Sequence, residues 1–157
     1  MNSTCFLIIL FLALVSPPAL ANKPFGAGVM LGDPTGLSFK YILNNKNFID
    51  AGLAWSGSID IHLHGDYLWK KPKVFVLDQK AVDLFYGVGA RLRERDRKRF
   101  SDDDDDGWQI GVRGPVGLSL FFNNPKIEIF AEIALVMNLV PDTDADLDAA
   151  IGGRFYF

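Results

Sequence analysis

Residues 108–122 read WQIGVRGPVGLSLFF, and their side chains alternate between two kinds over the whole stretch. Alternate residues of a β-strand point to opposite sides of the sheet, so the two sets describe two faces. One face carries Arg113 together with small and polar residues. The other is apolar and consists of Trp108, Ile110, Val112, Gly114, Val116, Leu118, Leu120 and Phe122. The stretch therefore predicts one long strand with two different faces.

Seven other segments show the same alternation and are separated by clusters of Gly, Pro, Asn and Asp, which favour turns. None of them has the 3.6-residue period of a helix. Eight strands without helices form a sandwich or a barrel, so we expect an all-β fold. The expected strands are 25–31, 37–43, 48–56, 61–69, 83–92, 108–122, 127–137 and 148–157. An extension of the fourth strand to residue 77 would shorten the connection that follows it.

The distribution of charge over the two faces separates the remaining architectures. The apolar faces contain no charged residue, whereas the opposite faces contain several glycines and ten charged residues: Lys40, Asp50, Asp66, Asp83, Arg91, Arg113, Glu128, Glu132, Asp148 and Arg154. Glycine suits the interior of a narrow closed barrel better than a strand face in water. Apolar side chains outside and polar ones inside are typical of membrane barrels. We therefore predict an eight-stranded antiparallel up-and-down transmembrane β-barrel.

Charges inside such a barrel must be paired, because an isolated buried charge is costly. We expect a polar network that fills the lumen, in which Lys and Arg side chains pair with Asp and Glu. Its predicted members are Lys40, Arg91, Arg113 and Arg154 on the cationic side and Asp50, Asp66, Glu128 and Glu132 on the acidic side.

Length and composition bound the remaining possibilities. The chain has 157 residues, 49% of them hydrophobic and 22% charged, with a formal net charge of −3. This length suits one domain, and the apolar content excludes intrinsic disorder. The small negative charge gives no electrostatic support for nucleic-acid binding. We assign no catalytic, cofactor-binding or metal-binding residue.

Residues 1–21 have the features of a secretory signal peptide, and the barrel domain is expected to occupy residues 22–157. An apolar core at 6–15 is followed by Ala19-Leu20-Ala21, a pattern that signal peptidase cleaves. The usual Lys or Arg before the core is missing, so an uncleaved membrane anchor is the alternative. Cys5 is the single cysteine, and cleavage would leave a chain without disulfides or thiolate chemistry.

The final residues 151–157 read IGGRFYF, with aromatic residues at alternating positions and a terminal Phe157. With the predicted signal peptide and the eight alternating segments, this chain resembles the small eight-stranded outer-membrane barrels of the OmpA-type and OmpX-like group. The resemblance implies that Phe155 and Phe157 form the signal recognised by the outer-membrane assembly machinery. Residues 32–37 and 141–144 are similar to a family of uncharacterised Gram-negative barrels, for which no activity is implied.

Three polar clusters have alternative interpretations. His62 and His64, close to Asp66, could share a metal or act in acid–base chemistry, or only form hydrogen bonds in the lumen. The hairpin at 93–107 combines arginines with five consecutive acids, which could pair with each other, bind divalent cations, or bind lipopolysaccharide phosphates. The alternating acids Asp142, Asp144, Asp146 and Asp148 resemble a calcium loop but lack its glycine and terminal glutamate.

Together these features predict a structural or interaction protein of the Gram-negative outer membrane, with both termini in the periplasm. Its lumen would be plugged, and the hairpin at 93–107 and an acidic loop at 138–147 would lie at the cell surface. The expected partners are outer-membrane lipids, lipopolysaccharide and the assembly machinery, with no nucleic acid and no cofactor. The alternatives are a lipid-A-modifying enzyme and a narrow, porin-like channel.

Overall fold

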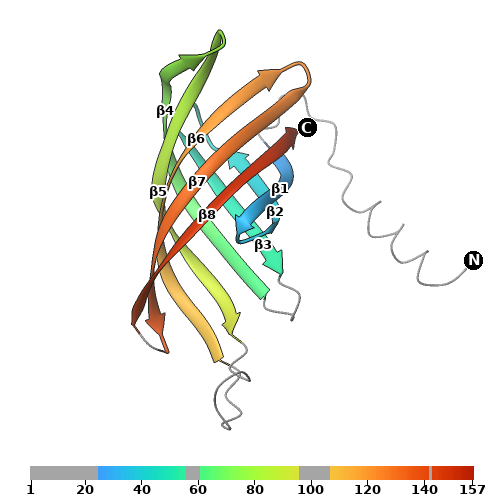
Figure 1. Ribbon diagram of the computed structural model, residues 1–157. Helices are drawn as coiled ribbons and strands as arrows, with labels where there is room; N and C mark the ends of the chain where they lie inside the picture. Colours follow the sequence, from blue (N-terminus) through green and yellow to red (C-terminus); the bar gives the residue numbers. More distant parts are fainter. Residues whose placement is uncertain (1–24, 56–60, 96–106, 142) are drawn as a thin grey trace, which may run out of the picture.

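The computed structural model describes residues 25–55, 61–95, 107–141 and 143–157. These residues form eight strands that close into one antiparallel barrel in sequence order (Figure 1). The strands are β1 (Phe25–Asp33), β2 (Gly36–Ile42), β3 (Asn47–Trp55), β4 (Ile61–Leu77), β5 (Lys80–Arg95), β6 (Gly107–Asn123), β7 (Lys126–Val140) and β8 (Asp144–Tyr156). The all-β, eight-stranded antiparallel barrel predicted from the alternation is confirmed for this part of the chain.

The barrel closes because β1 pairs with β8 as well as with β2. Gly28 of β1, for example, lies opposite Ser38 of β2 and Arg154 of β8. Closure gives the backbone groups of both terminal strands a partner, so neither becomes a free edge. Figure 1 shows that β4 to β7 are much longer than β1 to β3, which makes one side of the barrel wall taller than the other.

The two faces of each strand have the predicted directions. Ile129 is 51% exposed on the outside of the barrel, and Val112 and Leu118 are also exposed there. Arg113, one residue after Val112, is only 1% exposed. The outward face of β6 and β7 is therefore apolar, and the charged side chains at the alternate positions point inward.

The interior also contains an apolar layer that the polar-lumen prediction did not include. Phe48 and Phe85 meet edge to face, with ring centroids 5.8 Å apart, and Leu68 and Phe130 belong to the same buried cluster. Glycine makes room for such side chains. A Cβ atom at Gly52 would collide with the ring of His64 and the methyl group of Met30. The narrow interior is thus filled partly by large side chains packed against glycines.

The strand ends agree with the predicted boundaries in some places and differ in others. The extension of the fourth strand to residue 77 is confirmed, and Asp78 and Gln79 form the turn into β5. The acidic loop expected at 138–147 is much shorter, because β7 continues to Val140 and β8 begins at Asp144. Asn138 pairs with Asp144 in register, so the ladder continues through the polar residues.

Other predictions fall on residues outside the described ranges. These are the signal peptide at 1–21, residues 96–106 of the charged hairpin, and Asp142. Among the described residues, none forms a helix with the length and apolarity needed to cross a bilayer.

Candidate functional site

The main polar feature of the barrel is a set of ionisable side chains that point into its interior. All eight residues predicted to form the lumen network have exposed fractions of 8% or less. They come from every strand except β1, and they form three clusters along the barrel. Within the described part of the chain, the buried set contains four cations, Lys40, Arg91, Arg113 and Arg154, and five carboxylates, Asp50, Asp66, Glu128, Glu132 and Asp148.

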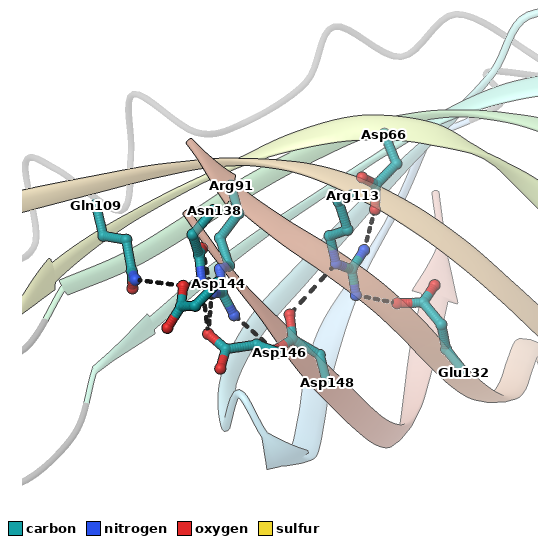
Figure 2. Close-up of polar contacts among 9 residues, drawn as sticks. All are labelled: Asp66, Arg91, Gln109, Arg113, Glu132, Asn138, Asp144, Asp146 and Asp148. Carbon is teal, nitrogen blue, oxygen red and sulfur yellow. Dashed lines mark hydrogen bonds and ion pairs between the residues drawn. The ribbon is translucent and has the colours of Figure 1, made fainter. Parts of the chain in front are cut away.

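The central cluster is built around Arg113 of β6 (Figure 2). Its guanidinium donates hydrogen bonds to Asp66 of β4 and to Glu132 of β7. The Nε atom lies 3.5 Å from Asp148 Oδ2 of β8. One arginine therefore connects three other strands across the lumen, in the geometry that a planar guanidinium favours for several carboxylates.

The second cluster lies toward the C-terminal end of the barrel. Arg154 pairs with Asp50 and with Glu128, and its Nε atom donates a hydrogen bond of 2.9 Å to Ser38 Oγ. Lys40 Nζ also donates to Glu128, at 2.5 Å, and the hydroxyl of Tyr156 donates to the same carboxylate at 2.7 Å. Glu128 thus receives three donors, which compensates the loss of its hydration.

The third cluster surrounds Arg91 of β5, near the opposite end of the barrel (Figure 2). Arg91 donates to Asp148 and Asn138 at 2.8 Å each, and it also pairs with Asp146. The sequence predicts that Arg91 pairs with one of the acids Asp50, Asp66, Glu128 and Glu132. This prediction is wrong, because its acidic partners are Asp146 and Asp148. Register explains the difference, because the inward positions of β8 nearest to Arg91 are Asp146 and Asp148 rather than the acids of β3, β4 or β7.

Three acids of the candidate calcium loop, Asp144, Asp146 and Asp148, lie on β8 in a different environment from a loop. Asp144, Asp146 and Asp148 alternate along a strand and share its inward face. Asn138 Nδ2 donates to Asp144 at 2.6 Å and to Asp146 at 3.0 Å. Gln109 Nε2 lies 3.4 Å from Asp144. These carboxylates accept hydrogen bonds from guanidinium and amide groups. Their i, i+2 spacing indicates a strand with all three acids on one face rather than a loop.

Other members of the network were also missed. Ser38, Gln109, Asn138 and Tyr156 all lie on predicted inward positions or continue them past the predicted strand ends. They were not singled out because they carry no charge at neutral pH. Their signal was the phase of the alternation alone, which places any residue of the polar face in the lumen.

The two histidines lie side by side on β4. The rings of His62 and His64 are 5.5 Å apart between centroids and nearly perpendicular. His64 lies opposite Arg91 and His62 opposite Arg93 in the ladder with β5. Within the described residues, His62 Nε2 and His64 Nδ1 are buried without a hydrogen-bond partner. In the same ranges, no group of three or more His, Cys, Asp or Glu residues could hold a metal ion.

A small cavity opens beside His62 at this end of the barrel. It has a volume of about 240 Å³ and is lined by residues 32–35, Ala54, Trp55, His62 and Arg93. Asp33 and Arg93 bring charges of both signs to its wall. The cavity is large enough for several water molecules.

Comparisons with known proteins add no relative to this picture. No family model, no curated protein and no solved structure matches the chain.

Proposed function

We propose that this protein is a structural or interaction barrel of the Gram-negative outer membrane, with a plugged lumen and no enzymatic activity. The observation that carries the proposal is the outer surface of the barrel. In the described residues, 33 large hydrophobic side chains are exposed, among them Leu135 at 60% and Ile151 at 62%. Apolar patches on soluble monomers rarely exceed a few hundred square ångströms, so a surface of this kind favours a lipid environment.

The backbone is suited to the same environment. Hydrocarbon offers no hydrogen-bond partner, so a chain that crosses it must satisfy its backbone groups internally, as a closed barrel does. A tilted strand needs about 9–11 residues to cross the hydrocarbon region. β1 and β3 have nine residues each and β4 to β8 have 13 or more. The strand lengths therefore support a spanning orientation over most of the wall.

Aromatic side chains at the strand ends support the same proposal. Trp55 and Trp108 are exposed near one end of the barrel, and Tyr41, Trp69 and Phe155 are exposed toward the other. Aromatic residues with these positions form the interfacial girdles of membrane barrels. Phe155 and Phe157 also point outward, with ring centroids 5.3 Å apart, and so are available to the assembly machinery proposed as a partner.

The interior supports a role other than transport. Each of its three ionic clusters joins several strands across the lumen, and the apolar layer fills the space around them. We expect the barrel to act as a stable support for its two ends, which would contact lipids, lipopolysaccharide or other molecules.

Membrane fractionation with gel mobility before and after boiling tests the proposal. A folded membrane barrel resists detergent and migrates differently from its boiled form, so we expect two bands and recovery with outer membranes. Recovery in a soluble fraction, or a mobility that boiling does not change, would contradict the proposed function.

A further inference from the structure

One hairpin of the barrel extends past its neighbours at the end that contains the C-terminus (Figure 1). We call residues 71–82 the lysine arm. The ladder between β3 and β4 ends with the pair of Asn47 and Trp69, followed by a backbone hydrogen bond from Lys70 to Lys46. Beyond this point β4 pairs only with β5. The arm therefore projects with one side uncovered by β3.

The base of the arm is fixed by a β-bulge. The register with β5 shifts between Lys71 and Phe75, and Lys73 has a φ of 55°. Asp83 stabilises this irregularity through both carboxylate oxygens. Oδ1 accepts a hydrogen bond of 2.9 Å from the backbone N–H of Lys73, and Oδ2 lies 3.4 Å from Lys70 Nζ. A bulge bends a strand and turns its side chains, so the arm leaves the barrel wall in a defined direction.

The surface of the arm combines exposed apolar side chains with cations. Val74, Phe75, Val76 and Leu77 are all exposed, Val76 by 65%. The arm also contains three lysines and a single acid, Asp78. Among the described residues, no acid forms an ion pair with these three lysines. Four adjacent exposed apolar residues next to such positive charge are a poor match for water and a good match for a membrane interface.

The arm is continuous with an aromatic group on the outside of the barrel. The ring of Trp69 contacts the rings of Tyr67 and Tyr86. Its centroid lies 5.3 Å from that of Tyr67 and 6.0 Å from that of Tyr86. Lys71 Nζ lies 5.9 Å from the ring centroid of Tyr86, and Lys80 Nζ lies 5.2 Å from that of Phe122. Lysines next to exposed aromatic rings near a membrane interface place their ammonium groups at the level of lipid phosphates.

We propose that the lysine arm binds the headgroups of anionic phospholipids in the leaflet next to the C-terminus. Lys71, Lys73 and Lys80 contact the phosphates, while Phe75, Val76 and Leu77 enter the boundary between headgroups and acyl chains. This inference rests on the proposed membrane location and names one lipid class that the barrel recognises there. A protein strand is a weaker candidate for the open side of the arm, because Pro72, the lysines and the bulge all oppose strand addition.

A fluorescent probe on the arm tests the proposal. Val76→Cys in the full chain, with Cys5 replaced by Ser, is labelled with an environment-sensitive fluorophore and refolded into phosphatidylcholine vesicles with or without phosphatidylglycerol. Some of the lipids carry brominated acyl chains, which quench the probe on contact. We expect a blue shift and strong quenching with phosphatidylglycerol, and much less of both without it or in high salt.

Matched variants separate charge recognition from general contact. Each lysine near an anionic surface contributes about 1 kcal/mol, roughly a fivefold preference. Lys71→Gln, Lys73→Gln and Lys80→Gln together should abolish most of the response to phosphatidylglycerol. Lys46→Gln with Lys126→Gln, two exposed lysines at the same end, one in the turn before β3 and one as the first residue of β7, should leave it unchanged. Equal quenching in both lipids, or no effect of the triple variant, would overturn the proposal.

Two further probe positions distinguish a failure of the lysine-arm proposal from a failure of the proposed membrane location. A probe at Ile129→Cys on the outer face should be quenched in both lipid mixtures, whereas a probe at Thr35→Cys, in the exposed turn at the other end, should not respond to phosphatidylglycerol. Loss of quenching at position 129 would contradict the proposed function itself. Quenching at position 129 without quenching at position 76 would overturn the lysine arm alone.

Discussion

Arg113 makes the largest number of ion pairs with buried carboxylates among the described residues, so it is the side chain whose loss should matter most. Its partners Asp66, Glu132 and Asp148 come from three strands and are 8% exposed or less. Removing one member of a buried ionic group leaves its partners without compensation, which costs more than the group contributes as a whole.

We therefore expect Arg113→Leu to lower the free energy of unfolding by about 3–5 kcal/mol. Urea unfolding of the refolded barrel in vesicles, followed by tryptophan fluorescence, measures the effect. Lys126→Gln, an exposed change at the first residue of β7, is the control and should stay within about 0.5 kcal/mol of the parent. An unchanged unfolding midpoint for Arg113→Leu would argue against the network.

The two aspartates that bind Arg91 provide a second comparison at the residue scale. The side chain of Asp146 is 38% exposed, whereas that of Asp148 is 2% exposed. An exposed ion pair is screened by water and contributes about 0–1 kcal/mol. We expect Asp146→Asn to cost less than about 1 kcal/mol and Asp148→Asn to cost about 3 kcal/mol. Equal effects in the same unfolding measurement would show that burial does not control these pairs.

At the scale of the elements, the sequence predicts each strand and the direction of its side chains. It does not predict which side chains from other strands they meet across the lumen. The alternation in 108–122 is sufficient to orient Arg113 inward, because it depends only on the geometry of one strand. The acids that Arg113 and Arg91 meet depend on the register of all neighbouring strands. Asp146 was missed for this reason, since the ladder between Asn138 and Asp144 extends past the predicted strand ends.

Packing between β3 and β4 can be tested by a double-mutant cycle at Gly52 and His64. A methyl group at Gly52 would collide with the His64 ring, so Gly52→Ala should cost about 1–3 kcal/mol. In a His64→Ala background the collision with the ring is removed and only the flexible methyl group of Met30 remains in the way, so the same substitution should cost less. A coupling energy above about 0.5 kcal/mol in urea unfolding would support the contact, and additive effects would contradict it.

At the scale of the whole molecule, we propose that the network and the apolar layer together close the barrel to ions. Eight strands leave an interior just wide enough for side chains to fill. Here the three arginines and Lys40 occupy it together with buried aromatic rings such as Phe48, and Lys40 Nζ lies 3.8 Å from the centroid of that ring. A wider path would require the loss of large side chains rather than a small movement of the wall.

This proposed closure predicts that the parent barrel gives no stepwise conductance in planar bilayers. Arg113→Ala combined with Arg154→Ala should open a path, because two long side chains are lost while the carboxylates of Asp66, Glu132 and Glu128 remain. The remaining negative charge favours cations, so the steps should be cation-selective. Leu118→Ala with Ile129→Ala removes similar volume from the outer face and should leave the barrel closed. Conductance of the parent protein would favour the channel alternative, and a closed double-arginine variant would show that the apolar layer alone blocks the lumen.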